Sequence, residues 1–180
     1  MNKKGFSLIE LLAVIIIIGI VATIGIVSIS SSVGSSRKAA FVNMARNYAD
    51  SASAMRTSDK LPVEPKNNEA LIIRVDNLTG VDQNDDYNTV YGDLVLDNCY
   101  VAVVNNKHQY KYYVTLVENS GNAIYNTEYS LLDEDSVVEH DKVVRNIINT
   151  RGAHVGLKVT VGEDTYTVKK VDPKYILLQK

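Results

Sequence analysis

Apolar and polar positions are distributed very unevenly along the 180 residues of this chain. The stretch from Phe6 to Ile29 is almost entirely apolar, and within it Leu11 to Val27 carries no charge and only Thr23 as a polar side chain. Because a helix rises about 1.5 Å per residue, Phe6 to Ile29 is long enough to cross a hydrocarbon layer about 30 Å thick. The pattern therefore predicts a membrane-spanning helix near the start of the chain.

The residues that follow favour a continuation of this helix. The run from Ser28 to Ser36 has the serine-rich composition of a linker, but an amphipathic stripe with spacings of three and four comes directly after it. The apolar members of this stripe are Phe41, Met44, Ala45, Tyr48, Ala52 and Met55. We therefore expect one helix from about Phe6 to Ser58, weakened through the serine run, with its second half packed on a globular head.

Beyond Leu61-Pro62, which ends the helix, the pattern becomes typical of β-strands. The expected strands are Leu71–Val75, Leu94–Leu96, Tyr100–Val104, Tyr110–Val117, Val155–Val161, Thr165–Val171 and Tyr175–Leu178. The run Ser136-Val137-Val138-Glu139 has the form of a capping box and predicts a short helix through Val144, Ile147 and Ile148 that ends at Gly152. The predicted fold class is α+β: a long N-terminal α-helix, an antiparallel β-sheet head and one short extra helix.

Charges at the N-terminus predict the orientation in the membrane. Lys3 and Lys4 precede the apolar segment, and the positive-inside rule keeps that end in the cytoplasm and the head outside. An ordinary secretory signal has a shorter apolar region, with a small-residue cleavage site after it. Here the only small residue at a plausible junction, Gly5, comes before the apolar run. Cleavage after Gly5 would remove the lysines and leave the helix on the mature protein.

Residues 3–12, Lys-Lys-Gly-Phe-Ser-Leu-Ile-Glu-Leu-Leu, resemble the prepilin signature of type IV pilins and of the pseudopilins of type II secretion. In that family a membrane prepilin peptidase cuts after the glycine and methylates the new N-terminal residue. The resemblance implies that Gly5 is the last leader residue, Phe6 the N-methylated first residue and Glu10 the near-invariant acid of the family. It also implies three partners: the prepilin peptidase, an assembly ATPase and a platform membrane protein.

These observations divide the chain into four expected segments. They are a prepilin leader at 1–5, a transmembrane or filament-core helix at 6–29, its amphipathic continuation at 30–60 and an extracytoplasmic β-rich head at 61–180. The precursor is expected in the bacterial cytoplasmic membrane as a single-pass protein with its N-terminus inside. After assembly the subunit is expected in a cell-surface pilus or an extracytoplasmic pseudopilus.

Glu10 and two glycines are the candidate functional residues of the apolar helix. A carboxylate among leucines and isoleucines is costly unless it is paired or protonated. One interpretation is an interfacial acid favoured by the helix dipole. The preferred one pairs Glu10 with the amino group of Phe6 after cleavage, and the resemblance implies a pairing between neighbouring subunits that sets their register. Gly19 and Gly25 either allow close helix packing or mark a part of the span that unwinds on assembly.

In the head, candidate binding groups do not form a recognisable site. Asp82, Asn84 and Asp86 belong to an oxygen-rich loop that is a candidate for Ca²⁺, but the loop lacks the glycine and spacing of an EF-hand. We interpret it as a solvated acidic turn and expect no cofactor. The basic and aromatic residues from Lys107 to Tyr113 are of the types found in single-strand binders, but alternate residues of a strand face opposite sides. The net charge of −2 gives no reason to expect nucleic acid as a partner.

Candidate catalytic residues are equally scattered. His108, His140 and His154 have no ligand-like spacing, and Glu139-His140-Asp141 is interpreted as local surface charge. Cys99 is the single cysteine, so it makes no internal disulfide, and its apolar neighbours predict a buried small hydrophobe rather than a nucleophile. No phosphate loop, nucleophile elbow or zinc motif occurs. We therefore do not expect an enzyme.

Assembly is the function that this organisation indicates. When the apolar helix leaves the membrane it must be buried against other copies or sibling pilins, and a repeated, non-closing contact yields an open filament. We therefore expect a structural subunit, a major or minor pilin, of a type IV pilus-like filament. One alternative is a pseudopilin of a type II secretion or DNA-uptake system. The other is a single-span, membrane-anchored binding module that does not polymerise and keeps residues 1–5.

Overall fold

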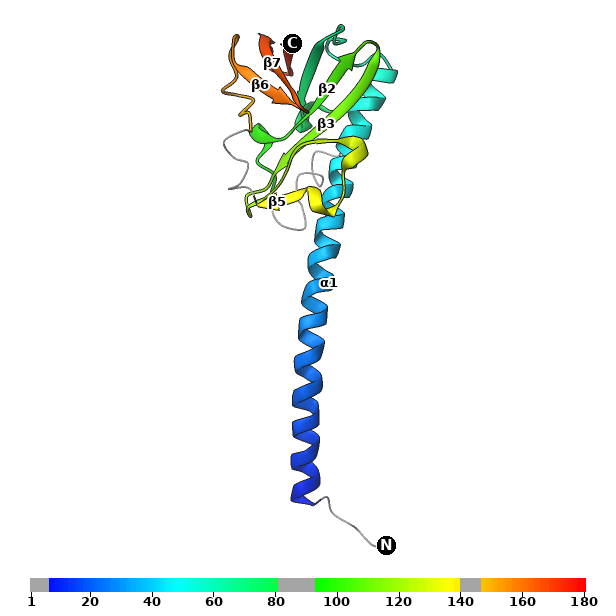
Figure 1. Ribbon diagram of the computed structural model, residues 1–180, viewed down its shortest axis with the longest axis vertical. Coiled ribbons are helices and arrows are strands. Elements are labelled where there is room, and N and C mark those ends of the chain that lie inside the picture. Colours follow the sequence, from blue (N-terminus) through cyan, green and yellow to red (C-terminus); the bar gives the residue numbers. More distant parts are fainter. Residues whose placement is uncertain (1–6, 81–92, 140–146) are drawn as a thin grey trace. The chain divides into compact units, whose positions relative to one another are not determined.

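The computed structural model describes residues 7–80, 93–139 and 147–180, without the side chains of residues 21–33. Its contacts divide the chain into two units, Met1–Arg37 and Lys38–Lys180. Helix α1 (Leu8–Thr57) contributes residues to both units, and the strands belong to the second unit, which we call the head (Figure 1). The fold is α+β, with an N-terminal helix and a curled antiparallel sheet, so the α+β class with an antiparallel sheet is confirmed.

The sheet has eight strands in the order β5-β4-β3-β2-β1-β8-β7-β6, and every neighbouring pair is antiparallel. The strands are β1 (Glu69–Arg74), β2 (Tyr100–Asn106), β3 (Gln109–Val117), β4 (Asn122–Glu128), β5 (Val137–Glu139), β6 (Lys158–Val161), β7 (Asp164–Val171) and β8 (Tyr175–Gln179). Short 3₁₀ turns are η1 (Val75–Asn77), η2 (Leu96–Asn98), η3 (Tyr129–Leu131) and η4 (Glu134–Ser136). The last strand, β8, pairs with the first, so the middle of the sheet joins residues about a hundred positions apart.

One face of the sheet packs against the second half of α1. The predicted stripe is buried there, with Met44 partly buried at its border. Small side chains at Ala45, Ala49 and Ala52 let the helix backbone come close to the sheet. The sheet contributes the residues of its strands that point to this side, among them Leu71, Ile73, Val101, Val103, Val114 and Leu116. The stripe therefore belongs to the core of the head.

Polar contacts fix the end of the helix on the sheet. The Arg56 Nε donates to the hydroxyl of Tyr112 at 2.9 Å, and its guanidinium lies 4.4 Å from the ring centre of Tyr110. The Tyr110 hydroxyl in turn donates to Glu64 Oε1 at 2.6 Å. The hydroxyl of Tyr112 and the ring of Tyr110 together fix the position and orientation of the Arg56 guanidinium, and with it the end of α1.

The opposite face of the sheet is covered by the sheet itself. Side chains from β6 and β7, including Val159, Val161, Tyr166 and Val168, form a second core with Ala70, Ile72, Ala102 and Leu178. Asn126 on β4 closes this curl, since its Nδ2 donates to the Gly162 carbonyl at 3.0 Å and its Oδ1 accepts from the Gly162 N–H at 2.7 Å. Central strands are thereby buried on both faces, which explains the unbroken apolar run of β1.

Two predictions about the head are wrong: the start of a helix at Ser136 and the strand at Leu94–Leu96. The short helix predicted from Ser136 is absent from the described residues: Val137–Glu139 form β5 and pair with β4. Ser136 is instead the end of η4, where Asp133 is the capping residue and accepts from the Ser136 N–H at 3.0 Å. Residues 140–146, on which the middle of that helix falls, lie outside the description. The strand predicted at Leu94–Leu96 is reduced to one bridge, Leu94 with Glu118.

Candidate functional site

Ser7 and Glu10 make two capping hydrogen bonds at the start of α1. The Ile9 N–H donates to Ser7 Oγ at 3.3 Å, and the Ser7 N–H donates to Glu10 Oε2 at 2.9 Å. These bonds satisfy donors that the start of a helix otherwise leaves free, and the second one holds the carboxylate at the positive end of the helix dipole. Glu10 thus folds back toward the chain that precedes the helix. Gly5 and Phe6 lie outside the described residues, so the pairing of Glu10 with the amine of Phe6 stays a prediction.

The helix that follows is apolar on every side. Among the described side chains of α1, ten large apolar ones are exposed, over a range from 48% for Val14 to 84% for Leu8. They are Leu8, Ile9, Leu11, Leu12, Val14, Ile15, Ile16, Ile17, Ile18 and Ile20, which we call the apolar sleeve. Four consecutive isoleucines, Ile15–Ile18, cover more than three quarters of a helical turn, so no polar face remains there. An apolar helix of this kind requires lipid or other apolar helices around it.

The described residues contain no helix with an apolar stretch long enough to cross a membrane. The span predicted from Phe6 to Ile29 continues beyond Ile20 into residues 21–33, whose side chains are outside the description. Gly25 falls in that part. At Gly19 an added Cβ would meet no atom within 4 Å, so no contact among the described residues requires a glycine there.

Residues 1–26 match the prokaryotic N-terminal methylation motif, the signature of type IV pilins and pseudopilins. The resemblance seen at Lys3 to Leu12 is therefore confirmed. The match supports a pilin-like precursor that is anchored in a membrane and processed by a prepilin peptidase, and it ends before the head begins. Beyond this motif, neither a curated protein nor a solved structure gives a significant match to the chain.

The basic and aromatic strand of the head is a structural element. Tyr110 and Tyr112 are partly buried against the core on the helix side, whereas Tyr113 packs against the second core. The predicted division of the tyrosines between two faces is confirmed. The Ca²⁺ candidates Asp82, Asn84 and Asp86, and with them His140, lie outside the described residues. Within the described ranges no three His, Cys, Asp or Glu residues come together as a metal site.

Cys99 is a buried thiol. Its Sγ accepts from the Val117 N–H at 3.2 Å and donates to the Val117 carbonyl at 3.4 Å. Burial raises the pKa of the thiol to about 12, so the group is neutral at physiological pH. Because the thiolate is the nucleophilic form, Cys99 acts as a small core residue, as its sequence neighbours predict.

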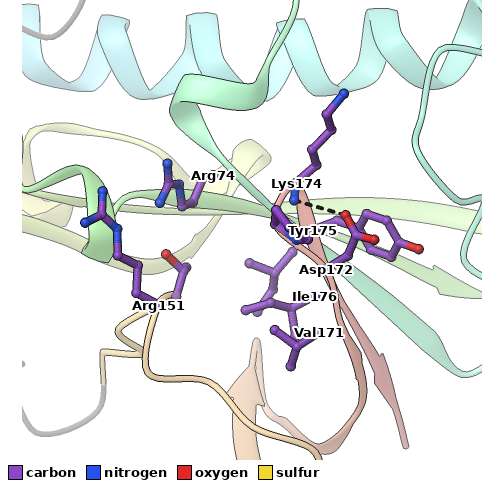
Figure 2. Close-up of a pocket in the computed structure, with 10 residues that line it drawn as sticks. Arg74, Arg151, Val171, Asp172, Lys174, Tyr175 and Ile176 are labelled. Carbon is purple, nitrogen blue, oxygen red and sulfur yellow. Dashed lines mark hydrogen bonds between the residues drawn. The ribbon is translucent and has the colours of Figure 1, made fainter.

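The head contains a cavity of about 300 Å³ that no sequence pattern indicates (Figure 2). Ile72, Val171 and Ile176 form an apolar wall of the cavity, and Arg74 and Arg151 lie across the cavity from this wall. Arg74 is paired with Asp76 and Asp97, and Arg151 Nε lies 2.8 Å from Asp97 Oδ1. Since β1, β8 and the loop before β6 contribute the lining, no local motif could reveal this site.

Proposed function

We propose that this chain is a structural subunit of a type IV pilus-like filament, made as a membrane-inserted precursor and assembled through α1. The observation that carries the proposal is the apolar sleeve, on a chain whose residues 1–26 carry the methylation motif. The apolar sleeve needs an apolar environment. The methylation motif is typical of proteins whose N-terminal helix moves from the membrane into the core of a filament.

The free energy gained by burying the apolar sleeve supports assembly through α1. Complete burial of a Leu or Ile side chain is worth about 1.5–3 kcal/mol. Ten side chains, each roughly half exposed, therefore gain on the order of 10 kcal/mol when lipid or protein covers them. A bilayer and a bundle of sibling helices both supply this gain, so the transfer between them has a small net free energy. Extension of the filament then requires work from outside, which agrees with a partner ATPase and a platform membrane protein.

Glu10 supplies the specificity that apolar contacts lack. Its carboxylate is already turned toward the N-terminal end of the helix by the hydrogen bond that it accepts from the Ser7 N–H. Cleavage after Gly5 places a new, charged amine on Phe6, next to Ser7 in the chain. In an apolar bundle, an unpaired carboxylate and an unpaired amine are both costly. The axial position in which the carboxylate of one subunit meets the amine of its neighbour therefore has the lowest free energy. This pairing fixes the axial register of successive subunits.

The head has the role of the outer, hydrated surface. It carries its own two cores, and the segment Lys38–Thr57 of α1 is part of one of them. The helix and the head are thus one folded subunit that is delivered together. We propose a structural role, not a catalytic one. A pseudopilin of a type II secretion or DNA-uptake system shares the same N-terminal motif and is the alternative function.

The state of the N-terminus tests the proposal first. The chain is expressed in a bacterium with a working pilus or pseudopilus system, and its N-terminal peptide is measured by mass spectrometry. We expect a peptide that begins with methylated Phe6. Gly5→Ala should retain Met1 and the leader, whereas the matched control Gly19→Ala should be cleaved normally. A wild-type protein that keeps residues 1–5 would instead be the anchored binding module.

Assembly is tested on the same cells. Sheared material is labelled with an antibody against the head and viewed by electron microscopy. Long labelled filaments support a pilus, and short stubs confined to the envelope support a pseudopilus. A processed chain that remains dispersed in the membrane, in cells that assemble other filaments, would refute the proposal.

A further inference from the structure

A second space in the head lies on the side of the second core, between the β6–β7 turn and the strands β2, β3 and β4. It is a recess of about 450 Å³, which is within the usual range for small-molecule sites, and we call it the hairpin recess. The clamp between Asn126 and Gly162 joins its two sides, so the recess is formed by the head alone. The lining side chains that bear on its chemistry are Asn106, Lys111, Tyr113, Glu128, Leu131 and Tyr166.

Tyr166 brings a hydroxyl group without a partner into this recess. Its side chain is 2% exposed, and among the described residues the hydroxyl makes no hydrogen bond. In the described part of the head, Asn98 Oδ1 is the unpaired polar atom that is fully enclosed, so the unpaired Tyr166 hydroxyl has to open into the space that it lines. Burial, and after it the nearby charge of Asp164, raises the pKa of Tyr166 to about 12, so the hydroxyl keeps its proton at physiological pH. This donor lacks an acceptor, which a ligand would supply.

The charged groups around the recess largely offset one another. Glu128 Oε2 accepts from Lys111 Nζ at 2.9 Å, and Asp164 Oδ1 lies 2.6 Å from Lys180 Nζ. The remaining carboxylate, Glu163, is exposed in the β6–β7 turn, where water screens its charge. An anion would meet three carboxylates in this lining, and a cation would compete with the two lysines for their partners. A neutral ligand avoids both costs.

Apolar surface lies beside these polar groups. Tyr113 is half-buried, and its hydroxyl donates to Glu128 Oε2 at 3.4 Å, so the aromatic ring adjoins the carboxylate. Leu131 is also part of the lining and is 66% exposed, so the described head leaves most of it uncovered. A ligand that satisfies this lining is therefore neutral, carries several hydrogen-bonding groups and has an apolar side.

We propose that the hairpin recess binds a neutral carbohydrate. Each sugar hydroxyl both donates and accepts, and the lining offers both kinds of partner: the carboxylate of Glu128 accepts, and the ammonium of Lys111 and the hydroxyl of Tyr166 donate. Asn106, which is exposed at the end of β2, adds an amide that does both. The C–H groups of the sugar ring lie on the apolar surface described above. This inference gives the head a ligand and does not require that the chain forms filaments.

Binding is measured on the purified full chain in lauryldimethylamine oxide, a detergent without a sugar group, by saturation-transfer difference NMR. The neutral probes are glucose, galactose and N-acetylglucosamine, and the charged probes are acetate and ethylammonium. We expect transfer to the ring protons of at least one of the three sugars, with a dissociation constant on the order of 1 mM, and no transfer to the charged probes. Because the sugar has no charge, about 0.5 M sodium chloride should leave this constant unchanged.

Two substitutions test whether the sugar lies in the recess. Tyr166→Phe removes the unpaired hydroxyl and keeps the ring in the second core, so it should weaken binding about three- to tenfold and leave the Tm of the head unchanged. The matched control Tyr175→Phe removes a hydroxyl that belongs to the other cavity, where it accepts from Lys170 Nζ at 2.7 Å, and sugar binding should stay as in the wild type. Asn106→Trp replaces an exposed residue of the lining with a side chain that fills the recess, and it should abolish binding.

Several results would overturn the inference. No transfer to any of the three sugars would show that the recess does not bind neutral carbohydrate. Stronger transfer to ethylammonium or acetate, weakened by salt, would identify a site for a charged ligand instead. Sugar binding that is unchanged in Asn106→Trp, or unchanged in Tyr166→Phe, would show that the sugar lies elsewhere or makes no use of the hydroxyl. None of these results bears on the proposed filament, which the methylated N-terminus and the labelled filaments test separately.

Discussion

The turn between β6 and β7 allows a stability prediction that can be worked from the coordinates. Gly162 has φ of +63°, and a Cβ added to it would lie 2.7 Å from Cζ and from the hydroxyl oxygen of Tyr113 and 2.9 Å from its Cε1. The left-handed backbone costs a non-glycine residue about 1–2 kcal/mol. The forced displacement of the ring adds about 1–3 kcal/mol, as other overpacked sites do. Gly162→Ala should therefore lower the free energy of unfolding of the head by about 2–5 kcal/mol.

The measurement is urea denaturation of the purified full chain in detergent, followed by near-ultraviolet circular dichroism of its eleven tyrosines. The matched control is Gly121→Ala, because Gly121 also has positive φ, at +98°, but an added Cβ there meets no atom within 4 Å. We expect the control to cost only the backbone contribution of about 1–2 kcal/mol. In a Tyr113→Ala background, the cost of Gly162→Ala should fall to the same range.

This cycle separates the two causes of the expected loss. If Gly162→Ala cost no more than Gly121→Ala, the close contact with Tyr113 would not exist. If its cost stayed the same without the tyrosine ring, the loss would come from the backbone alone. Either result would refute the arrangement in which the β6–β7 turn is clamped onto β3 and β4 and closes the second core.

Other expected outcomes concern Glu10, Glu69 and Cys99. Glu10→Ala should leave membrane insertion intact and abolish assembly, measured as filaments in the sheared fraction; unchanged filaments would remove the register role. Burial acts to raise the pKa of Glu69, but hydrogen bonds from Lys169 and from the Lys66 N–H outweigh it and hold the pKa below its ordinary value. The stabilisation of the folded head by ionised Glu69 is thus complete above the ordinary pKa of about 4.3 and is lost as the pH falls through the lowered pKa. Glu69→Gln should therefore flatten the acid side of the profile of Tm against pH. A profile as steep as that of the wild type would contradict this. Cys99 should resist maleimide at neutral pH and react only on unfolding, and labelling of the folded head would show that its burial is wrong.

The elements that the sequence predicts well are those with a local periodic signal. The stripe from Phe41 to Met55 is buried as its spacing indicates, and Tyr110 to Val117 falls within β3. The N-terminal motif was also recognisable from sequence, because charge, glycine, aromatic residue and acid occur within eight positions. These signals depend on neighbouring residues alone.

The predictions that failed required knowledge of distant partners. Ser136 and Glu139 have the spacing of a capping box, but Val138 pairs with Ala123 on β4, and this strand contact determines the local structure. The second core depends on the clamp between Asn126 and Gly162, and the cavity of the head depends on the pairing of β1 with β8. No local pattern encodes pairings of such separation.

The burial of Phe41 to Met55 within the head has a mechanical consequence. A tension applied along this part of the helix acts on all its contacts with the sheet at once, in shear, and not on one contact after another. The apolar side chains and the anchor of Arg56 on Tyr112 then share the load. A subunit built in this way distributes a pull over its sheet, so separating the head from this part of the helix takes more force than breaking the same contacts one after another.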